Sequence, residues 1–231
     1  MELTRADIGI NSTYATLFNA RCTSCEIQDD KSAYWAPLLY YQYANGSLSE
    51  VPHDGSVVYY IGRGVNTTYE VFPPGFRMLS GNAGARSYDN TTMTYGDADN
   101  PGRPVADRIS FACLDVSGPQ RETPYIGNTN CSDGLRAQLH FQSCWNGVDL
   151  YKTDNSHVAY MSNIDNGICP PTHPHHFIHL FLETLYSVNQ VAKEPGGRFM
   201  LSMGDPTGYG YHGDFQNGWY VTDVSSISNL P

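Results

Sequence analysis

The sequence is poor in charge and very poor in lysine. Only 16% of its 231 residues are charged, and three of them are lysine. The net charge of −10 disfavours binding to phosphate backbones or to anionic membranes, so neither nucleic acid nor a membrane is an expected partner. A neutral or cationic partner such as a glycan fits this charge better, although acidity also serves solubility alone.

Long hydrophobic runs and signatures of nucleotide or acyl chemistry are also missing. The longest apolar run, near residues 177–182, is too short to span a bilayer. The first residues, Met-Glu-Leu-Thr-Arg, lack the apolar stretch of a signal peptide. The absence of G-x-S-x-G disfavours an α/β-hydrolase, and the absence of a P-loop or a G-x-G-x-x-G after a strand disfavours nucleotide binding. No repeat or linker divides the chain, so residues 1–231 are expected to form one domain.

Turn-forming residues are abundant and separate short runs that have strand character. The chain has 22 Gly, 14 Pro and 17 Tyr, and Asn-Gly or Asp-Gly occurs six times. Periodicity alone does not separate a buried strand from a helix at 177–188, but its β-branched and aromatic residues favour a long central strand. We therefore predict an all-β fold, a β-sandwich or jelly roll with long disulfide-tied loops, one of them at 80–107. The predicted strands are 57–61, 108–114, 137–145, 177–188 and 198–203.

Six cysteines predict three disulfides, as is typical of exported proteins. Cys22-Thr-Ser-Cys25 is a C-x-x-C, but a zinc ribbon needs a second C-x-x-C and a thioredoxin-like site needs a βαβ context. Both are missing. The expected pairs are Cys22–Cys25, Cys113–Cys131 and Cys144–Cys169.

Five N-glycosylation sequons also favour export. The sequon at Asn130 contains Cys131, which the expected disulfide engages, so that site is the weakest of the five. Glycans are expected on most of Asn11, Asn45, Asn66 and Asn90.

Histidines gather in the C-terminal half, where six of the eight lie between 157 and 212. Imidazole suits divalent transition metals, but neither H-E-x-x-H nor the spacing of a facial triad is present. A divalent metal bound by these histidines and a set of scattered surface histidines therefore both stay open.

The glycine-rich segment 204–219 combines an imidazole, a carboxylate and aromatic rings. His212 and Asp214 are two residues apart, so they point the same way in an extended chain. A carboxylate beside an imidazole fixes its tautomer and raises its basicity, which suits a general base or a metal ligand. The alternative is a tight glycine-rich turn whose aromatic side chains pack in the core.

A third group lies at residues 145–157, where two carboxylates, Asp149 and Asp154, precede His157. Paired carboxylates are what glycoside cleavage needs. Aspartates in a loop rich in Asn, Gly and Ser also serve as ordinary turn residues.

Seven ordered stretches together resemble a secreted domain of unknown function from fungi and actinobacteria. Members of that family often carry a WSC cell-wall carbohydrate-binding domain, so the resemblance implies an extracellular location and a polysaccharide partner. The stretches are 22–25, 31–37, 72–78, 143–149, 156–160, 169–174 and 211–219. The family normally begins with an H-x-H segment shortly before the position of Gly9, where this chain has Met-Glu-Leu-Thr-Arg-Ala-Asp. We therefore expect the site here to lack those two histidines.

These observations lead to one hypothesis for activity, a secreted, extracellular or cell-wall-associated hydrolase or lyase that acts on polysaccharide. His212 would be the general base, oriented by Asp214, and His157 or Asp149 would be the acid. His157, His173 and His212 would face one cleft. The expected substrate-binding residues are Trp145, His173, Tyr211 and Trp219.

Two other classes stay open. One is a non-catalytic extracellular module that binds glycan or assembles with itself, which abundant tyrosine and low charge suit equally. The other is a histidine-rich metal-binding protein.

Overall fold

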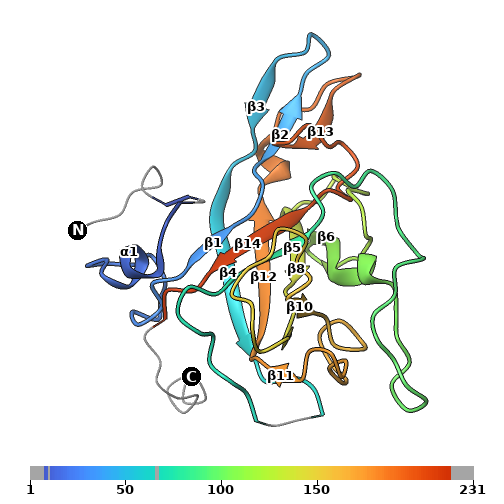
Figure 1. Ribbon diagram of the computed structural model, residues 1–231. Helices are drawn as coiled ribbons and strands as arrows, with labels where there is room; N and C mark the ends of the chain where they lie inside the picture. Colours follow the sequence, from blue (N-terminus) through green and yellow to red (C-terminus); the bar gives the residue numbers. More distant parts are fainter. Residues whose placement is uncertain (1–7, 10, 66–67, 220–231) are drawn as a thin grey trace.

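The computed structural model describes residues 8–9, 11–65 and 68–219, and strands dominate its regular structure (Figure 1). The fold class predicted from the sequence is confirmed. In chain order the elements are α1 (Tyr14–Phe18), β1 (Ala33–Trp35), β2 (Leu39–Gln42), β3 (Leu48–Glu50), β4 (His53–Ile61), β5 (Arg77–Gly81), η1 (Val105–Arg108), β6 (Ile109–Asp115), β7 (Gly118–Pro119), β8 (Leu135–His140), β9 (Cys144–Trp145), β10 (Val158–Ala159), β11 (His175–His176), β12 (His179–Tyr186), η2 (Val188–Gln190), β13 (Arg198–Leu201) and β14 (His212–Gln216).

Two antiparallel sheets pack face to face, and β14 crosses β12 in the view of Figure 1. One has the strand order β4-β12-β8-β6-β7 and the other the order β1-β14-β5. They approach closely at Gly213, where a Cβ would lie 2.5 Å from Leu139 Cδ2. The hydroxyl of Tyr211 donates a hydrogen bond of 3.2 Å to Thr184 Oγ1 across the same interface. The result is a sandwich-like arrangement with its core between the sheets.

The core follows from alternation along the central strands. In β12, Leu180 and Leu182 are buried while Phe181 and Glu183 are partly exposed. In β14, Phe215 is buried and contacts Phe72 with ring centroids 4.9 Å apart. Because buried and more exposed side chains alternate along these strands, burying one face stabilises the packing of the sheets.

The two remaining sheets are small. Sheet β13-β2-β3 projects beyond the sandwich (Figure 1), and Tyr41 packs edge-on against Phe199 within it at 5.0 Å. Sheet β10-β9-β11 joins the loops that follow β8. These extensions carry long connections away from the core.

The predicted central strand at 177–188 is confirmed, since β12 pairs with β4 on one side and β8 on the other. The predicted strand at 137–145 is instead two strands, β8 and β9, interrupted at residues 141–143. The side chain of Gln142 is buried and donates to Leu79 O at 3.0 Å. This contact with β5 turns the chain between β8 and β9.

Two of the three expected disulfides are formed, Cys113–Cys131 and Cys144–Cys169. Each closes a loop whose cross-link stabilises the fold by roughly 3 kcal/mol in the chain-entropy account. The third expected bridge is wrong, because Cys22 and Cys25 are free thiols. Thr23 Oγ1 accepts a hydrogen bond from Cys25 N, and this turn leaves Cys22 in solvent and Cys25 half-buried. Burial, followed by the charge of Asp30, raises the pKa of Cys25.

A buried carboxylate organises the glycine-rich segment before β14. Asp205 is 0% exposed, and its Oδ1 accepts from Thr207 N at 2.8 Å and from Thr207 Oγ1 at 2.6 Å. Its Oδ2 accepts from Gly208 N at 3.1 Å and from Gly210 N at 2.7 Å. Arg86 Nε lies 3.6 Å from Oδ1 and supplies a countercharge. These contacts meet the requirement that a buried charge be paired and hydrogen-bonded.

A chain of buried and partly buried polar side chains links β8, the turn after it and β12. Ser143 Oγ lies 2.8 Å from His179 Nδ1, and His179 Nε2 lies 3.0 Å from His140 Nδ1. Burial lowers the pKa of both imidazoles, that of His179 well below its usual range. Both rings therefore resist protonation, because a buried imidazolium would lack the hydration that stabilises it in water.

Replacing the buried carboxylate by an amide should destabilise the protein. In the variant Asp205→Asn an NH2 group replaces one carboxylate oxygen and faces the N–H donors of Gly208 and Gly210, which lose their acceptor. We expect a loss of about 3 kcal/mol in the free energy of unfolding, measured by urea denaturation. The control Asp154→Asn changes an exposed carboxylate and should leave the midpoint nearly unchanged. Equal midpoints for both variants would show that the Asp205 contacts do not support the loop.

The neutral imidazoles predict a stability that falls as the pH falls from about 7.5 to about 5.5. The unfolded chain takes up protons near the ordinary histidine pKa of about 6.5, whereas the fold keeps His179 unprotonated. His179 alone should contribute roughly 1 kcal/mol of lost stability at the lower pH. Urea midpoints at both pH values for the wild type and for His179→Asn test this. The variant is expected to be less stable overall but less sensitive to pH; an unchanged pH sensitivity contradicts the prediction.

Candidate functional site

His157, one of the expected catalytic histidines, is buried and belongs to the frame of the fold. Its Nε2–H donates to the backbone oxygen of Arg77 in β5 at 2.7 Å, and its ring packs on Phe76 at 5.6 Å. Burial lowers the pKa of His157 despite the opposing effect of this hydrogen bond. A neutral ring fixed to a strand edge is placed for structure rather than for proton transfer to a ligand.

The loop that contains His157 lies along the free edge of β5. Arg77 N donates to Leu150 O at 2.9 Å, and Leu79 N donates to the side-chain oxygen of Asn155 at 3.3 Å. The expected acid Asp149 is bonded within this loop, to Asn146 Nδ2 at 2.8 Å and to Lys152 Nζ at 3.2 Å. These contacts lower the pKa of Asp149, with the Asn146 hydrogen bond the main cause. Asp149 is therefore a turn-forming anion and a poor proton donor.

Trp145 and His173 support the same loop. Trp145 Nε1 donates to Asp149 O at 2.7 Å, and its ring stacks on Phe177 at 5.5 Å. His173 Nε2 lies 3.2 Å from Ser156 O. The structure thus brings Trp145, Asp149, His157 and His173 into one neighbourhood, and their recorded contacts hold loops together.

Two of the expected sugar-stacking rings lie inside the protein. Tyr211 is 0% exposed and packs on Phe111, while Trp219 is 4% exposed and donates from Nε1 to Tyr60 Oη at 2.6 Å. The expectation that they stack on a substrate is corrected, because an enclosed ring presents no face to a sugar. For these two rings the alternative expectation is correct, because they pack in the core.

The expected meeting of His157, His173 and His212 is not seen in either hollow described below, since none of the three lines one. His212 Nδ1 bonds to Gly210 O at 2.8 Å. Within the described residues, no imidazole makes a hydrogen bond to Asp214. Asp214 itself, however, does line a hollow.

This hollow, of about 290 Å³, lies over the outer face of sheet β1-β14-β5. The register places Asp214 of β14 between Trp35 of β1 and Leu79 of β5, and places Gln216 opposite Arg77. Trp35 is 63% exposed, which is unusual for so large an apolar ring. The residues that give the hollow its chemical character are Trp35, Arg77, Tyr151, Asp214 and Gln216.

Asp214 is half-buried and accepts no hydrogen bond from any described residue. Burial raises its pKa, and the nearby His212 only partly opposes this rise. A carboxyl group in this setting lacks partners for its oxygens. It is therefore ready to bind a ligand hydroxyl or to hold a proton at a higher pH than an ordinary aspartate.

The rim of the hollow is tied to the N-terminal segment. Gln216 Nε2 donates to Gly9 O at 3.2 Å, and Arg77 Nη2 donates to Ser12 O. The residues at 8 and 9 line the hollow as well. Residues of three strands and of the distant N-terminal segment thus form the hollow together.

Sequence reasoning found Asp214 but missed Trp35, Arg77, Tyr151 and Gln216. Trp35 lies within one of the stretches that carry the family resemblance, so that stretch was a signal for it. The pairing of β1 with β14, which places it beside Asp214, is not encoded locally. The second turn-forming aspartate, Asp154, remains exposed and bonded to Ser156 N at 3.0 Å.

The described residues also bear on metal binding, membrane spanning and glycosylation. Among them, no three His, Cys, Asp or Glu side chains are grouped so that they could hold a metal ion. In the same ranges no helix has the length and apolarity to cross a membrane. Asn11, Asn45 and Asn90 are exposed, as their predicted glycosylation requires, and Asn66 lies outside the described residues.

Comparison with known proteins shows the family of the chain. Neither a curated protein nor a solved structure matches the chain. A family model described as a domain of unknown function, DUF1996, matches residues 4–219. This match covers nearly the whole sequence and agrees with the type of family that the seven motifs indicated. The chain therefore belongs to the DUF1996 family.

Proposed function

We propose that the protein is secreted and binds an extracellular polysaccharide in the hollow over sheet β1-β14-β5. The observation that carries the proposal is a half-buried carboxyl group, Asp214, that has no hydrogen-bond partner among the described residues and lies beside a broadly exposed tryptophan ring, Trp35. Two disulfides and the exposed sequons at Asn11, Asn45 and Asn90 support an extracellular location.

The aromatic part of the hollow suits the apolar face of a sugar ring. Trp35 and Tyr151 both line it, and they are 63% and 45% exposed. A pyranose presents axial C–H groups on one face, which an indole or phenol ring covers by dispersion and by its negative π surface. Two rings in one hollow favour an oligosaccharide segment over a single sugar.

The polar part suits sugar hydroxyl groups. The carboxyl oxygens of Asp214 can accept hydrogen bonds, and Gln216 lies next to Asp214 on the same face of β14. The net charge of −10 favours a neutral glycan over a polyanionic one.

A second candidate function is cleavage of the bound glycan, and the raised pKa of Asp214 favours it. A protonated Asp214 would give its proton to the glycosidic oxygen as the bond to the anomeric carbon breaks. Water would add to that carbon and return a proton to the carboxylate. Asp214 is the one carboxyl group among the described residues that line the hollow, so binding is the better-supported function.

Removal of the exposed ring should weaken glycan binding without unfolding the protein. We expect Trp35→Ala to lower affinity about tenfold or more for a neutral polysaccharide that the wild type retains, as measured by affinity electrophoresis across a polysaccharide panel. Tyr59→Ala is the matched control, since Tyr59 is an exposed ring on β4 of the other sheet. Equal loss in both variants, or no retention of any polysaccharide by the wild type, contradicts the proposal.

Cleavage is tested separately with Asp214→Asn. If Asp214 is the acid, wild-type release of reducing ends falls as the pH rises through its raised pKa, because the proton to be donated is lost. The variant should release none, while its glycan affinity changes by less than about tenfold. A wild type that retains glycan and never releases reducing ends rejects cleavage and leaves the binding function standing.

A further inference from the structure

The β4 edge of the large sheet is open. β4 stands at one end of the strand order β4-β12-β8-β6-β7, and among the described strands it pairs with β12 alone. No backbone hydrogen bond joins residues 54–61 to any other described segment. In an antiparallel sheet, alternate N–H and C=O groups of an edge strand point away from its neighbour. β4 therefore presents a row of backbone groups to which another strand can bind.

This edge lacks the features that commonly protect a strand edge. Residues 55–62, Gly-Ser-Val-Val-Tyr-Tyr-Ile-Gly, contain no charged residue and no proline. Val57 is 55% exposed and Tyr59 is 41% exposed, so apolar side chains are uncovered along the edge. The strand at the opposite edge of the sheet, β7, has only two residues, and one of them is Pro119. Pairing with a further strand is therefore favoured at β4 and disfavoured at β7.

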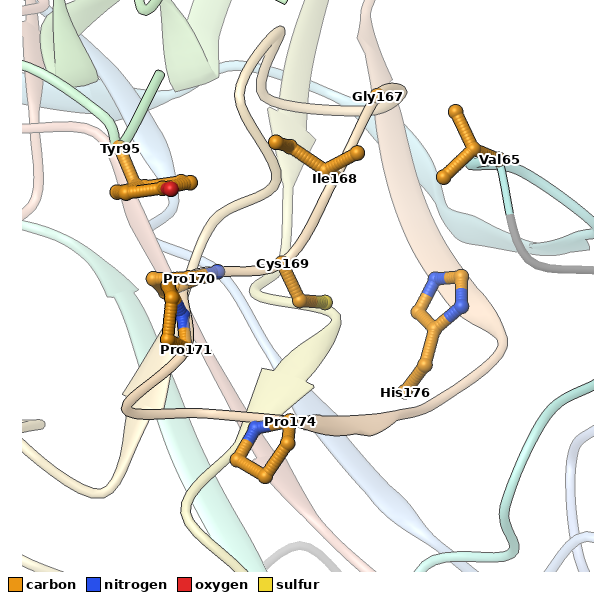
Figure 2. Close-up of a pocket in the computed structure, with 9 residues that line it drawn as sticks. All are labelled: Val65, Tyr95, Gly167, Ile168, Cys169, Pro170, Pro171, Pro174 and His176. Carbon is orange, nitrogen blue, oxygen red and sulfur yellow. The ribbon is translucent and has the colours of Figure 1, made fainter. Parts of the chain in front are cut away.

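The chain that follows β4 is anchored. Gly64 N donates to the side-chain oxygen of Asn166, and Val65 N donates to Gly167 O, both at 2.9 Å. Figure 2 shows Val65 and Gly167 among the residues around a second hollow, of about 360 Å³. These hydrogen bonds fix the end of β4, so Arg63, which follows the strand, has a defined position at the edge.

Opposite charges stand at the two ends of this strand. Asp54 is exposed at its start, and Arg63 is exposed just past its end, where it lies 4.0 Å from Asp165. Nine residues of strand separate Asp54 from Arg63 by about 30 Å, so the two cannot meet within one molecule. A second β4 that runs antiparallel beside the first brings Asp54 of each copy next to Arg63 of the other.

The same arrangement matches the apolar side chains. Val57 and Tyr59 lie on the outer face of the sheet, whereas Val58 and Tyr60 pack against the core. A two-fold axis at Val58 places Val57 of each copy opposite Tyr59 of the other. A β-branched residue opposite an aromatic one is a favourable cross-strand pair. The strand is therefore complementary to itself in its charges and in its side-chain pairs.

We propose that two copies of the protein form a closed dimer by antiparallel pairing of their β4 strands, which joins the two large sheets into one. The partner is a second copy, because β4 itself supplies both members of the Asp54–Arg63 and Val57–Tyr59 pairs. Two-fold pairing occupies both β4 edges, so the assembly stops at two. No residue of β4 lines the hollow over sheet β1-β14-β5, so the dimer is independent of the proposed glycan site.

Sedimentation equilibrium of the full chain tests the proposal, and we expect a reversible monomer–dimer equilibrium. Val57→Lys places a charge at the edge, beside Tyr59 of the other copy, and should weaken dimerisation about tenfold or more. Val116→Lys is the matched control, because Val116 is an exposed valine in the turn between β6 and β7. The control should leave the equilibrium unchanged. A wild type that stays monomeric up to about 1 mM, or a dimer that Val57→Lys does not weaken, overturns the proposal.

Charge reversal tests the register of the pairing. Asp54→Arg and Arg63→Asp each place like charges side by side, twice in the dimer because of the two-fold axis. Each should weaken dimerisation about tenfold at low salt. The double variant Asp54→Arg/Arg63→Asp restores opposite charges and should recover most of the wild-type affinity. A double variant as weak as the single ones contradicts the proposed pairing. Both positions are exposed, so these variants decide even if Val57→Lys does not fold.

Discussion

The buried carboxylate of Asp205 is the constraint on which the hollow over sheet β1-β14-β5 depends. Its hydrogen bonds hold residues 207–210 in one conformation, and the chain enters β14 directly after this loop. β14 is the central strand of its sheet, so its position sets both faces of that sheet. Phe215 fills the core on one face, and Asp214 lines the hollow on the other. A structural carboxylate thus helps to set the position of the carboxyl group that lines the hollow.

The sequence was sufficient for features that depend on local pattern. β-Branched and aromatic residues predicted the strand β12, and the order of the cysteines along the chain predicted two of three disulfides. Features that depend on distant contacts were not predictable in this way. The break between β8 and β9 arises because Gln142 reaches Leu79 O, and Cys22 and Cys25 stay apart because Thr23 orders their turn differently.

The candidate site shows the same division. The glycine-rich segment drew attention to Asp214, but alternation along β14 was no guide to which neighbours would be enclosed. Tyr211 precedes the strand and enters the core, while Trp35, from a strand nearly 180 residues earlier, becomes Asp214's neighbour. Histidines that are close in sequence lie in different surroundings for the same reason. His176 and His179 are buried in different contacts, and His175 pairs with Glu70 near the surface.

The loop along β5 has a consequence for how copies of the protein meet at high concentration. An uncovered strand edge offers unpaired N–H and C=O groups to the strand of another molecule, which is a common route to fibres and precipitates. Here Arg77 N, Arg77 O and Leu79 N are already bonded to Leu150, His157 and Asn155. His157 and its loop therefore block this edge, and strand-to-strand pairing between molecules would have to use another strand edge.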